Sequence, residues 1–233
     1  MKFLKGLVAP WPSILVLGVV LLGTAGLAAG AWAWPRAWAG IAVFAVAAMT
    51  GSGILAVLRP ASFEVRQQSF VARDKRQPLI DAVGLFVYLA FILAWLAFIP
   101  MDVFRLKLLP APPSAVSAAG LLVGLAGLMA SYVAIGQNPF AAPTIHDQSG
   151  NGQRVIDTGL YGVVRHPFYA GMLLLYAGSA LWLGSYAAFI GALGFLFFTL
   201  ARIGIEEAWL REHLPDYAAY ARRVRSRLIP YVL

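Results

Sequence analysis

The sequence predicts an all-α fold: a polytopic membrane helix bundle of about six transmembrane helices, ending in a helical hairpin and a cytoplasmic amphipathic helix. Of its 233 residues, 61% are hydrophobic and 12% are charged, and the charged share is about half that of an ordinary soluble domain. The mean hydropathy of +0.76 points the same way. Apolar segments suited to a hydrocarbon layer of ~30 Å recur along the chain, and basic residues gather on one side of the resulting topology.

The apolar segments cover approximately residues 13–34, 37–58, 79–99, 114–135, 168–183 and 186–203. Lys2 and Lys5 precede the first one, and Ala31-Trp32-Ala33 fits a cleavage pattern, so a signal peptide is an alternative. This segment exceeds the ~7–15 residues of a signal peptide core, and another apolar segment follows at once, so we expect an uncleaved span. Only Gly184-Ser185 separates the last two segments, which predicts a tight hairpin whose first arm is short for a full crossing.

The distribution of basic residues predicts that both termini are cytoplasmic, and the expected location is the inner membrane of a bacterium. Three basic residues fall outside, namely Arg36, Arg105 and Lys107, whereas fifteen fall inside. The fifteen are Lys2, Lys5, Arg59, Arg66, Arg73, Lys75, Arg76, Arg154, Arg165, Arg202, Arg211, Arg222, Arg223, Arg225 and Arg227. Membrane topology therefore accounts for the net charge of +8, and we expect no nucleic-acid partner.

The cytoplasmic segments suggest two parts, with transmembrane helices 1 to 4 in residues 1–136 and a functional core in residues 137–233. The loop 59–78 is charged and is expected along the inner surface. The loop 137–166 is long and polar, and the tail from 206 to 233 is expected to begin as an amphipathic helix, so together they form a cap. One face of that helix carries Trp209, Leu210, Leu214, Tyr217 and Tyr220.

Two features of the sequence limit the kinds of site and of helix packing that the chain can form. The chain has no cysteine, which excludes disulfides, thiolate metal sites and a cysteine nucleophile, and we expect no metal site. Gly120 and Gly124 with Gly127 form a small-residue face, which favours close helix packing inside one bundle, with a homodimer contact as the alternative. The oligomeric state stays open.

The densest polar cluster precedes the fifth apolar segment. A helix is expected to begin at Pro167, so Arg165 and His166 lie just before its N-terminus, where unpaired N–H groups favour an anion. Tyr169 and Gly171 follow one turn inside. The alternative is that Arg165 is only a snorkelling membrane anchor and His166 a surface residue.

A second polar cluster lies where the sixth segment emerges. Because the hairpin arms are antiparallel, Arg202, Glu206 and Glu207 should lie beside Arg165 and His166. An ion pair between Arg202 and Glu206, four residues apart, is the simplest alternative. Anion donors, carboxylates and an apolar wall suit a zwitterionic, cationic cofactor such as S-adenosylmethionine, and on charge alone a phospholipid headgroup fits nearly as well.

These residues resemble a known family. The run Gly159-x-Tyr161-x-x-x-Arg165-His166-Pro167-x-Tyr169-x-Gly171, followed by Arg202-x-x-x-Glu206-Glu207, Tyr217-x-x-Tyr220 and a tail ending at Pro230, is similar to the isoprenylcysteine carboxyl methyltransferase superfamily. That superfamily includes phospholipid N-methyltransferases and membrane thiol S-methyltransferases. The similarity covers residues 138–230, and Leu160 stands where the family usually has proline.

The resemblance implies a methyltransferase that uses S-adenosylmethionine in a cytoplasmic pocket closed by the C-terminal helix, with a lipid-facing tunnel for a lipid or other lipophilic acceptor. Arg202 and Glu206 would face the acceptor as catalytic residues. With Arg165 from the anion site, the expected cofactor-binding residues are Gln153, Val155, Gly159, Tyr161, Arg165, His166, Pro167, Tyr169 and Glu207.

The type of acceptor stays open at this point. A carboxylate acceptor needs no general base and would be held by Arg202, whereas an amine or thiol must lose a proton, to Glu206 or His166. The alternatives to a methyltransferase are an NADPH-dependent membrane lipid reductase and a non-enzymatic membrane protein. For the reductase, Arg154 is the only obvious spare cation in the cytoplasmic loop for the extra phosphate.

Overall fold

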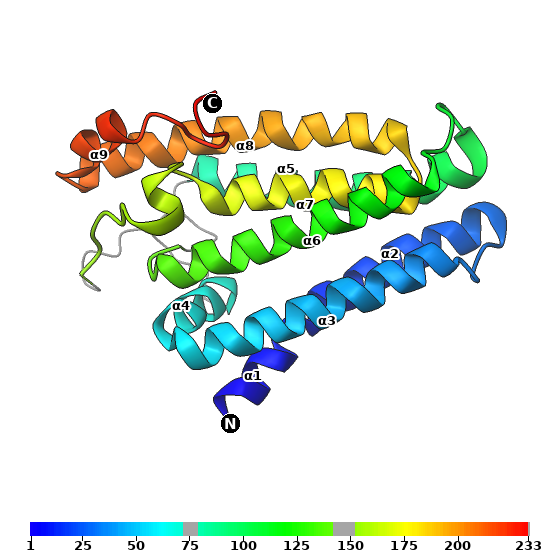
Figure 1. The fold of residues 1–233 in the computed structure, drawn as a ribbon, viewed down its shortest axis with the longest axis horizontal. Coiled ribbons are helices and arrows are strands. Elements are labelled where there is room, and N and C mark those ends of the chain that lie inside the picture. Colours follow the sequence, from blue (N-terminus) through cyan, green and yellow to red (C-terminus); the bar gives the residue numbers. More distant parts are fainter. Residues whose placement is uncertain (72–78, 142–151, 233) are drawn as a thin grey trace.

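The computed structural model describes residues 1–71, 79–141 and 152–232, and these residues form helices and connecting loops without a strand (Figure 1). The predicted charges Arg73, Lys75 and Arg76 lie outside the described residues. The elements are α1 (Lys2–Val8), α2 (Trp11–Ala29), α3 (Pro35–Leu58), α4 (Pro60–Val71), α5 (Leu79–Met101), a π-helical turn η1 (Asp102–Leu106), α6 (Ser114–Gln137), a 3-10 turn η3 (Gly159–Gly162), α7 (Pro167–Leu183), α8 (Tyr186–His213) and α9 (Tyr217–Arg223).

The helices confirm the predicted polytopic membrane bundle. Within the described ranges, five helices are long and apolar enough to cross a membrane: Lys2–Ala29, which joins α1 to α2, then α3, Val83–Leu106, α6 and α8. The sixth apolar helix is α7, whose 17 residues make it the short hairpin arm that the sequence predicts. The protein is therefore an integral membrane protein.

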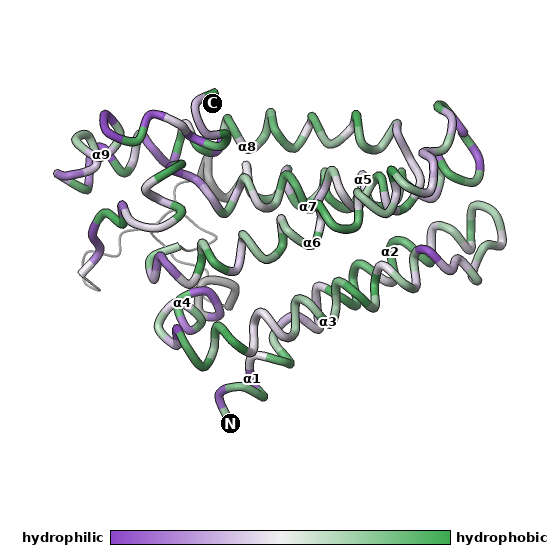
Figure 2. The backbone as a smooth tube through the Cα atoms, in the orientation of Figure 1, coloured by the Kyte–Doolittle hydropathy of each residue, from purple (hydrophilic) through white to green (hydrophobic). Residues whose placement is uncertain are grey.

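The bundle has two unlike ends. The N-terminus, α4 and α9 lie toward the left end in Figure 1, and the turns joining α2 to α3 and α7 to α8 lie at the right end. Hydrophilic residues gather mainly at the left end, while the long helices are largely apolar (Figure 2). The left end is thus the one that the distribution of basic residues predicts to be cytoplasmic.

The hairpin turn between α7 and α8 is built from a few polar contacts. Gly184 takes a left-handed conformation with φ of 96°, which suits glycine at the end of a helix. The Ser185 hydroxyl accepts a hydrogen bond from the Ala188 N–H and caps α8. The same hydroxyl donates to the buried carboxylate of Asp102 at 2.6 Å, so η1 anchors the turn.

Glycines let α6 and α7 approach closely. A Cβ on Gly127 would lie 2.4 Å from the carbonyl oxygen of Gly171, and one on Gly178 would lie 2.4 Å from that of Gly120. Both distances are far below van der Waals contact, so larger residues would force the helices apart. The predicted use of this small-residue face for packing inside one bundle is confirmed.

The C-terminal tail differs in one respect from the prediction. No new helix begins at Glu206, because α8 continues to His213. The helix ends at Leu214, whose φ of −118° and ψ of 105° are extended, as expected for a residue before proline. The predicted amphipathic face is therefore divided between the end of α8, with Leu210, and the short helix α9, with Tyr217 and Tyr220.

Candidate functional site

A cavity of about 400 Å³, here called the cap cavity, opens at the left end of the bundle among α5, α7, α8 and α9. One part lies under the cap and is lined by Gln153, Val155, Tyr161, Tyr217 and Tyr220. The other part reaches between the membrane helices and is lined by apolar and aromatic residues. These are Leu85, Tyr88, Leu89, Ile92, Met172 and Tyr176.

The start of α7 forms as the sequence predicts. Pro167 is the first helical residue, and His166 occupies the cap position before it. The N–H groups of Arg165 and His166 donate to the carbonyl oxygens of Ser226 and Arg227, each at 2.9 Å. The residues before α7 are therefore held by the C-terminal segment, defined here as residues 224–228.

Glu207 connects the two predicted clusters. One carboxylate oxygen, Oε1, accepts a hydrogen bond from Arg165 Nε at 2.7 Å and lies 3.2 Å from His166 Nε2. The other, Oε2, accepts from Arg211 at 2.9 Å and from Arg227 at 3.4 Å. The predicted proximity of the hairpin ends is confirmed, and Glu207 is fully buried behind the cavity wall.

The guanidinium of Arg165 also fastens the C-terminal segment. Its Nη1 donates to the carbonyl oxygens of Val224 and Arg225 at 2.6 and 2.7 Å. Arg165 is 8% exposed, so its charge is nearly withdrawn from solvent and depends on these partners and on Glu207. It is thus more than a snorkelling anchor, because it ties α7, α8 and the tail together.

A short chain of hydrogen bonds lies in the middle of the cap cavity. Arg202 Nε donates to the Tyr169 hydroxyl at 3.0 Å, and that hydroxyl donates to Glu206 Oε2 at 2.9 Å. Glu206 Oε1 lies 3.9 Å from His166 Nδ1, which is too long for a hydrogen bond. All three side chains line the cavity, so a guanidinium, a phenol and a carboxylate face the same space.

The turn η3 is fixed from two sides. Gly159 has a φ of 59°, and a Cβ there would lie 2.5 Å from the Gln137 side chain, so the position requires glycine. Gln137 Oε1 accepts from the Leu160 N–H at 2.9 Å. The Tyr220 hydroxyl donates to the Tyr161 carbonyl oxygen at 2.8 Å, and burial raises the pKa of this phenol, so it stays protonated.

One polar atom in the cavity lacks a partner. Among the residues that the structure describes, the buried Tyr217 hydroxyl makes no hydrogen bond. Burial also raises the pKa of this phenol, so the group is neutral and can both donate and accept. An orphaned buried hydroxyl costs free energy unless a ligand satisfies it.

The structure brings most of the predicted site residues together in the cap cavity. The residues that line it are Gln153, Val155, Tyr161, Arg165, His166, Tyr169, Arg202 and Glu206. Gly159, Pro167 and Glu207 do not line it, and they shape or support its wall instead. Sequence reasoning missed Arg66, Tyr88 and Asn138, which also line the cavity. For Arg66, the sequence offered one indication of a role at the site: it is a basic residue in a loop predicted to lie along the membrane.

Residues 115–216 match the family model described as phospholipid methyltransferase. No curated protein matches the sequence significantly. The matched segment runs from α6 through η3 and the α7–α8 hairpin to the turn before α9. This family belongs to the isoprenylcysteine carboxyl methyltransferase superfamily, so the predicted resemblance is confirmed, and the match begins earlier than the predicted residue 138.

Proposed function

We propose that this integral membrane protein, which carries a phospholipid methyltransferase module over residues 115–216, transfers a methyl group from S-adenosylmethionine to a lipophilic acceptor. The observation that carries the proposal is the cap cavity itself. It joins a polar part under the cytoplasmic cap to an apolar part between the membrane helices, with Tyr169, Arg202 and Glu206 where the two parts meet.

The cap side of the cavity fits the cofactor. The unpartnered Tyr217 hydroxyl offers a hydrogen bond, and Gln153 with Tyr161 adds polar groups beside the apolar Val155. Gly159 and Pro167 would shape this side, and Glu207 would act on it by holding Arg165 and His166 in place. When bound, S-adenosylmethionine supplies a methyl group on a sulfonium centre, which an acceptor atom can displace in line.

The membrane side of the cavity fits the acceptor. Its lining residues Leu89, Ile92 and Met172 are apolar, so they receive a hydrocarbon group and exclude water from the reacting atoms. Arg202 and Glu206 lie on α8 one turn apart and are held by Tyr169. Positioning two reactants about 3–3.5 Å apart supplies most of the rate enhancement for such a displacement.

The same residues serve either kind of acceptor. A carboxylate acceptor would be held by the Arg202 guanidinium and would need no base. For an amine or thiol, Glu206 is one candidate base, because 28% of its side-chain surface is exposed. His166 is the other: a proton on Nε2, facing Glu207 Oε1 at 3.2 Å, leaves the lone pair on Nδ1.

The orientation follows from the charges. Arg165, Arg202, Arg211 and the arginines of α9 and the tail lie at the end of the bundle that carries the cap cavity. By the positive-inside rule, we place this end in the cytoplasm, where S-adenosylmethionine is available.

The test is calorimetric titration of the detergent-purified protein with S-adenosylhomocysteine and, separately, with NADPH. We expect binding of the former only, and Tyr217→Phe should weaken it about fivefold, the effect of one neutral hydrogen bond. Tyr231→Phe is the matched control because Tyr231 is 98% exposed. If NADPH binds and S-adenosylhomocysteine does not, the proposed function changes from a methyltransferase to a reductase. If neither binds at millimolar concentration, both proposed functions are refuted.

A further inference from the structure

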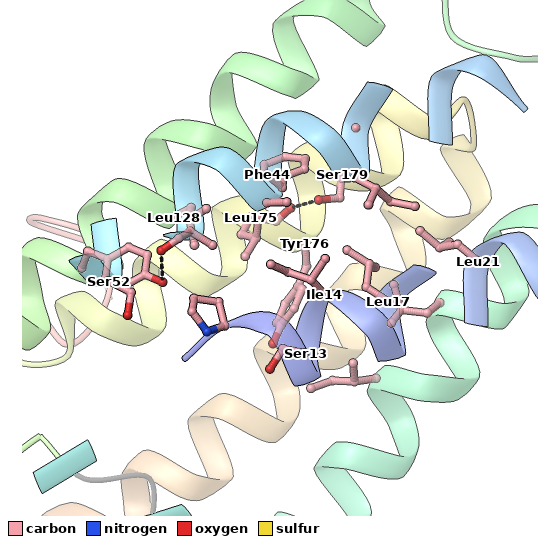
Figure 3. A pocket seen from close by; sticks show the side chains of 18 of the residues that line it. Ser13, Ile14, Leu17, Leu21, Phe44, Ser52, Leu128, Leu175, Tyr176 and Ser179 are labelled. Carbon is pink, nitrogen blue, oxygen red and sulfur yellow. Dashed lines mark hydrogen bonds between the residues drawn. The ribbon is translucent and has the colours of Figure 1, made fainter. Parts of the chain in front are cut away.

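A second cavity of about 350 Å³, here called the N-terminal cavity, lies among α2, α3, α5, α6 and α7. Its walls are mostly apolar. Figure 3 shows Ile14, Leu17 and Leu21 of α2 on one side, facing Phe44, Leu128 and Leu175 on the other. The helices α2, α3 and α5 precede residue 115, so much of this cavity is built by a part of the chain outside the matched module.

The two cavities share part of their walls. Ser13, Arg66, Ile92 and Tyr176 line both of them, so these four residues form a common boundary. Along α3 the residues that line the N-terminal cavity run from Ala37 to Leu55. At 1.5 Å per residue this is ~27 Å, close to the full ~30 Å thickness of the hydrocarbon layer.

Arg66 places a positive charge at this boundary. It extends from α4 at the cytoplasmic end, and its guanidinium carbon lies 4.8 Å from the centre of the Phe168 ring. Tyr132, Tyr161 and Tyr169 are its electrostatic neighbours, and burial lowers the pKa of the guanidinium, which stays charged at neutral pH. A half-buried cation beside an apolar cavity favours a ligand that joins an anionic group to a hydrocarbon chain.

We propose that the acceptor binds with a single hydrocarbon chain in the N-terminal cavity and with an anionic group against Arg66, so that its reacting atom reaches Tyr169, Arg202 and Glu206. This inference rests on the proposed function, and it adds a binding residue and a chain-binding region outside the matched module. A single chain is specified because a volume of about 350 Å³ spread over this length is too narrow for two chains side by side, and Arg66 lines both cavities. The anionic group is a phosphate or a carboxylate.

The experiment uses quenching of tryptophan fluorescence, since Trp95 and Trp182 line the N-terminal cavity. The probes are single bromine-labelled alkyl chains that carry a phosphate, a carboxylate or a trimethylammonium group. Both anionic probes should bind about tenfold more tightly than the cationic probe, and Arg66→Gln should remove that difference while Arg66→Lys keeps part of it. The tighter of the two anionic probes identifies the acceptor's anion.

Filling the N-terminal cavity tests where the chain lies. Ala45→Phe places a ring in the cavity and should abolish quenching, whereas Ala42→Phe, on the exposed side of the same helix, should leave it unchanged. Ala48→Leu is a milder filling variant if Ala45→Phe does not fold. Equal quenching in the filling and control variants, equal affinity for cationic and anionic probes, or displacement of the probes by two-chain phospholipids would each overturn the proposal.

Failure of the acceptor-site proposal can be distinguished from failure of the proposed methyltransferase function. Binding of S-adenosylhomocysteine is measured on the unmodified protein and on Ala45→Phe, which should leave it unchanged because Ala45 lines the N-terminal cavity and not the cap cavity. If the unmodified protein binds S-adenosylhomocysteine but none of the anionic probes, the acceptor site alone is refuted. Failure of the unmodified protein to bind S-adenosylhomocysteine refutes the methyltransferase itself.

Discussion

At the scale of single residues, Glu207 holds two residues of the cavity wall without lining the cavity itself. Its carboxylate has no exposed surface and is shared among Arg165, His166, Arg211 and Arg227. Arg211 and Arg227 are nearly half exposed, so the contact that matters most for stability is the buried one with Arg165. Glu207 therefore determines where Arg165 and His166 lie.

Glu207→Gln should destabilise the protein and weaken cofactor binding. The change leaves the Arg165 guanidinium buried without its counter-charge, and losing one partner of a buried ion pair costs about 3 kcal/mol. Thermal unfolding in detergent measures the loss of stability. The matched control is Glu212→Gln, an exposed acid on the same helix, and an equal effect of both changes would contradict this role.

Arg202→Ala should leave binding of S-adenosylhomocysteine intact and lower turnover by about 100-fold, the usual consequence of misplaced reactants. The guanidinium donates to Tyr169, which in turn donates to Glu206, so its removal loosens both groups at the acceptor side. Methyl transfer from radiolabelled S-adenosylmethionine to a membrane lipid extract measures turnover. Arg222→Ala, an exposed arginine of α9, is the control, and full activity of Arg202→Ala would show that the role is assigned to the wrong residue.

At the scale of helices, the α6–α7 contact and the hairpin decide where the site forms. The glycines of α6 bring its backbone against α7, and the Asp102–Ser185 contact fixes the turn from α7 to α8. The start of α7 and the end of α8 then meet at the end of the bundle that carries the cap cavity. This explains why residues about forty apart in sequence share a hydrogen-bonded cluster.

Gly178→Ala should be destabilising although alanine favours helix. The added Cβ would lie 2.4 Å from backbone atoms of α6, and overpacking of this kind costs about 1–3 kcal/mol. Gly84→Ala, on an exposed face of α5 with no neighbouring atom within 4 Å, should instead be neutral or slightly stabilising. Thermal unfolding of the two variants side by side makes the comparison, and similar midpoints would argue against tight α6–α7 packing.

The sequence predicts these elements unevenly, for physical reasons. Hydropathy finds the membrane segments, and proline marks the start of α7, because both signals are local. Local signals did not show that α8 continues past Ile203 to His213, since a helix keeps its backbone hydrogen bonds after leaving the hydrocarbon region. They also did not show that residues 224–228 bind the backbone of Arg165 and His166, because that contact depends on tertiary packing.

The role of α4 is the other feature that local reasoning missed. Its sequence contains charged residues and has an average hydropathy near zero, so by itself it indicates only a segment on the surface of the membrane. The structure turns Arg66 inward to a boundary that α2, α5 and α7 also form. Whether Arg66 faces the cavities or the membrane surface therefore depends on helices that are distant from it in sequence.

At the scale of the whole molecule, the two ends of the bundle should face different compartments. Because the chain has no cysteine, single cysteines can be introduced without background. Ala218→Cys, exposed on α9, should react with a membrane-impermeant thiol reagent only from the cytoplasmic side, and Ala111→Cys, exposed in the loop before α6, only from the outside. Labelling of intact and permeabilised cells measures this, and the reverse pattern would invert the topology.

The shortness of α7 has a consequence for the surrounding membrane. Its 17 residues span ~25 Å, several ångströms less than the ~30 Å hydrocarbon thickness. This hydrophobic mismatch either thins the bilayer around α7 or draws its polar start, with His166, below the headgroup level. In both cases a lipid substrate would meet the polar residues without being pulled out of its leaflet. Enzyme activity should then fall as reconstituted bilayers are made thicker, which ties the reaction rate to lipid composition.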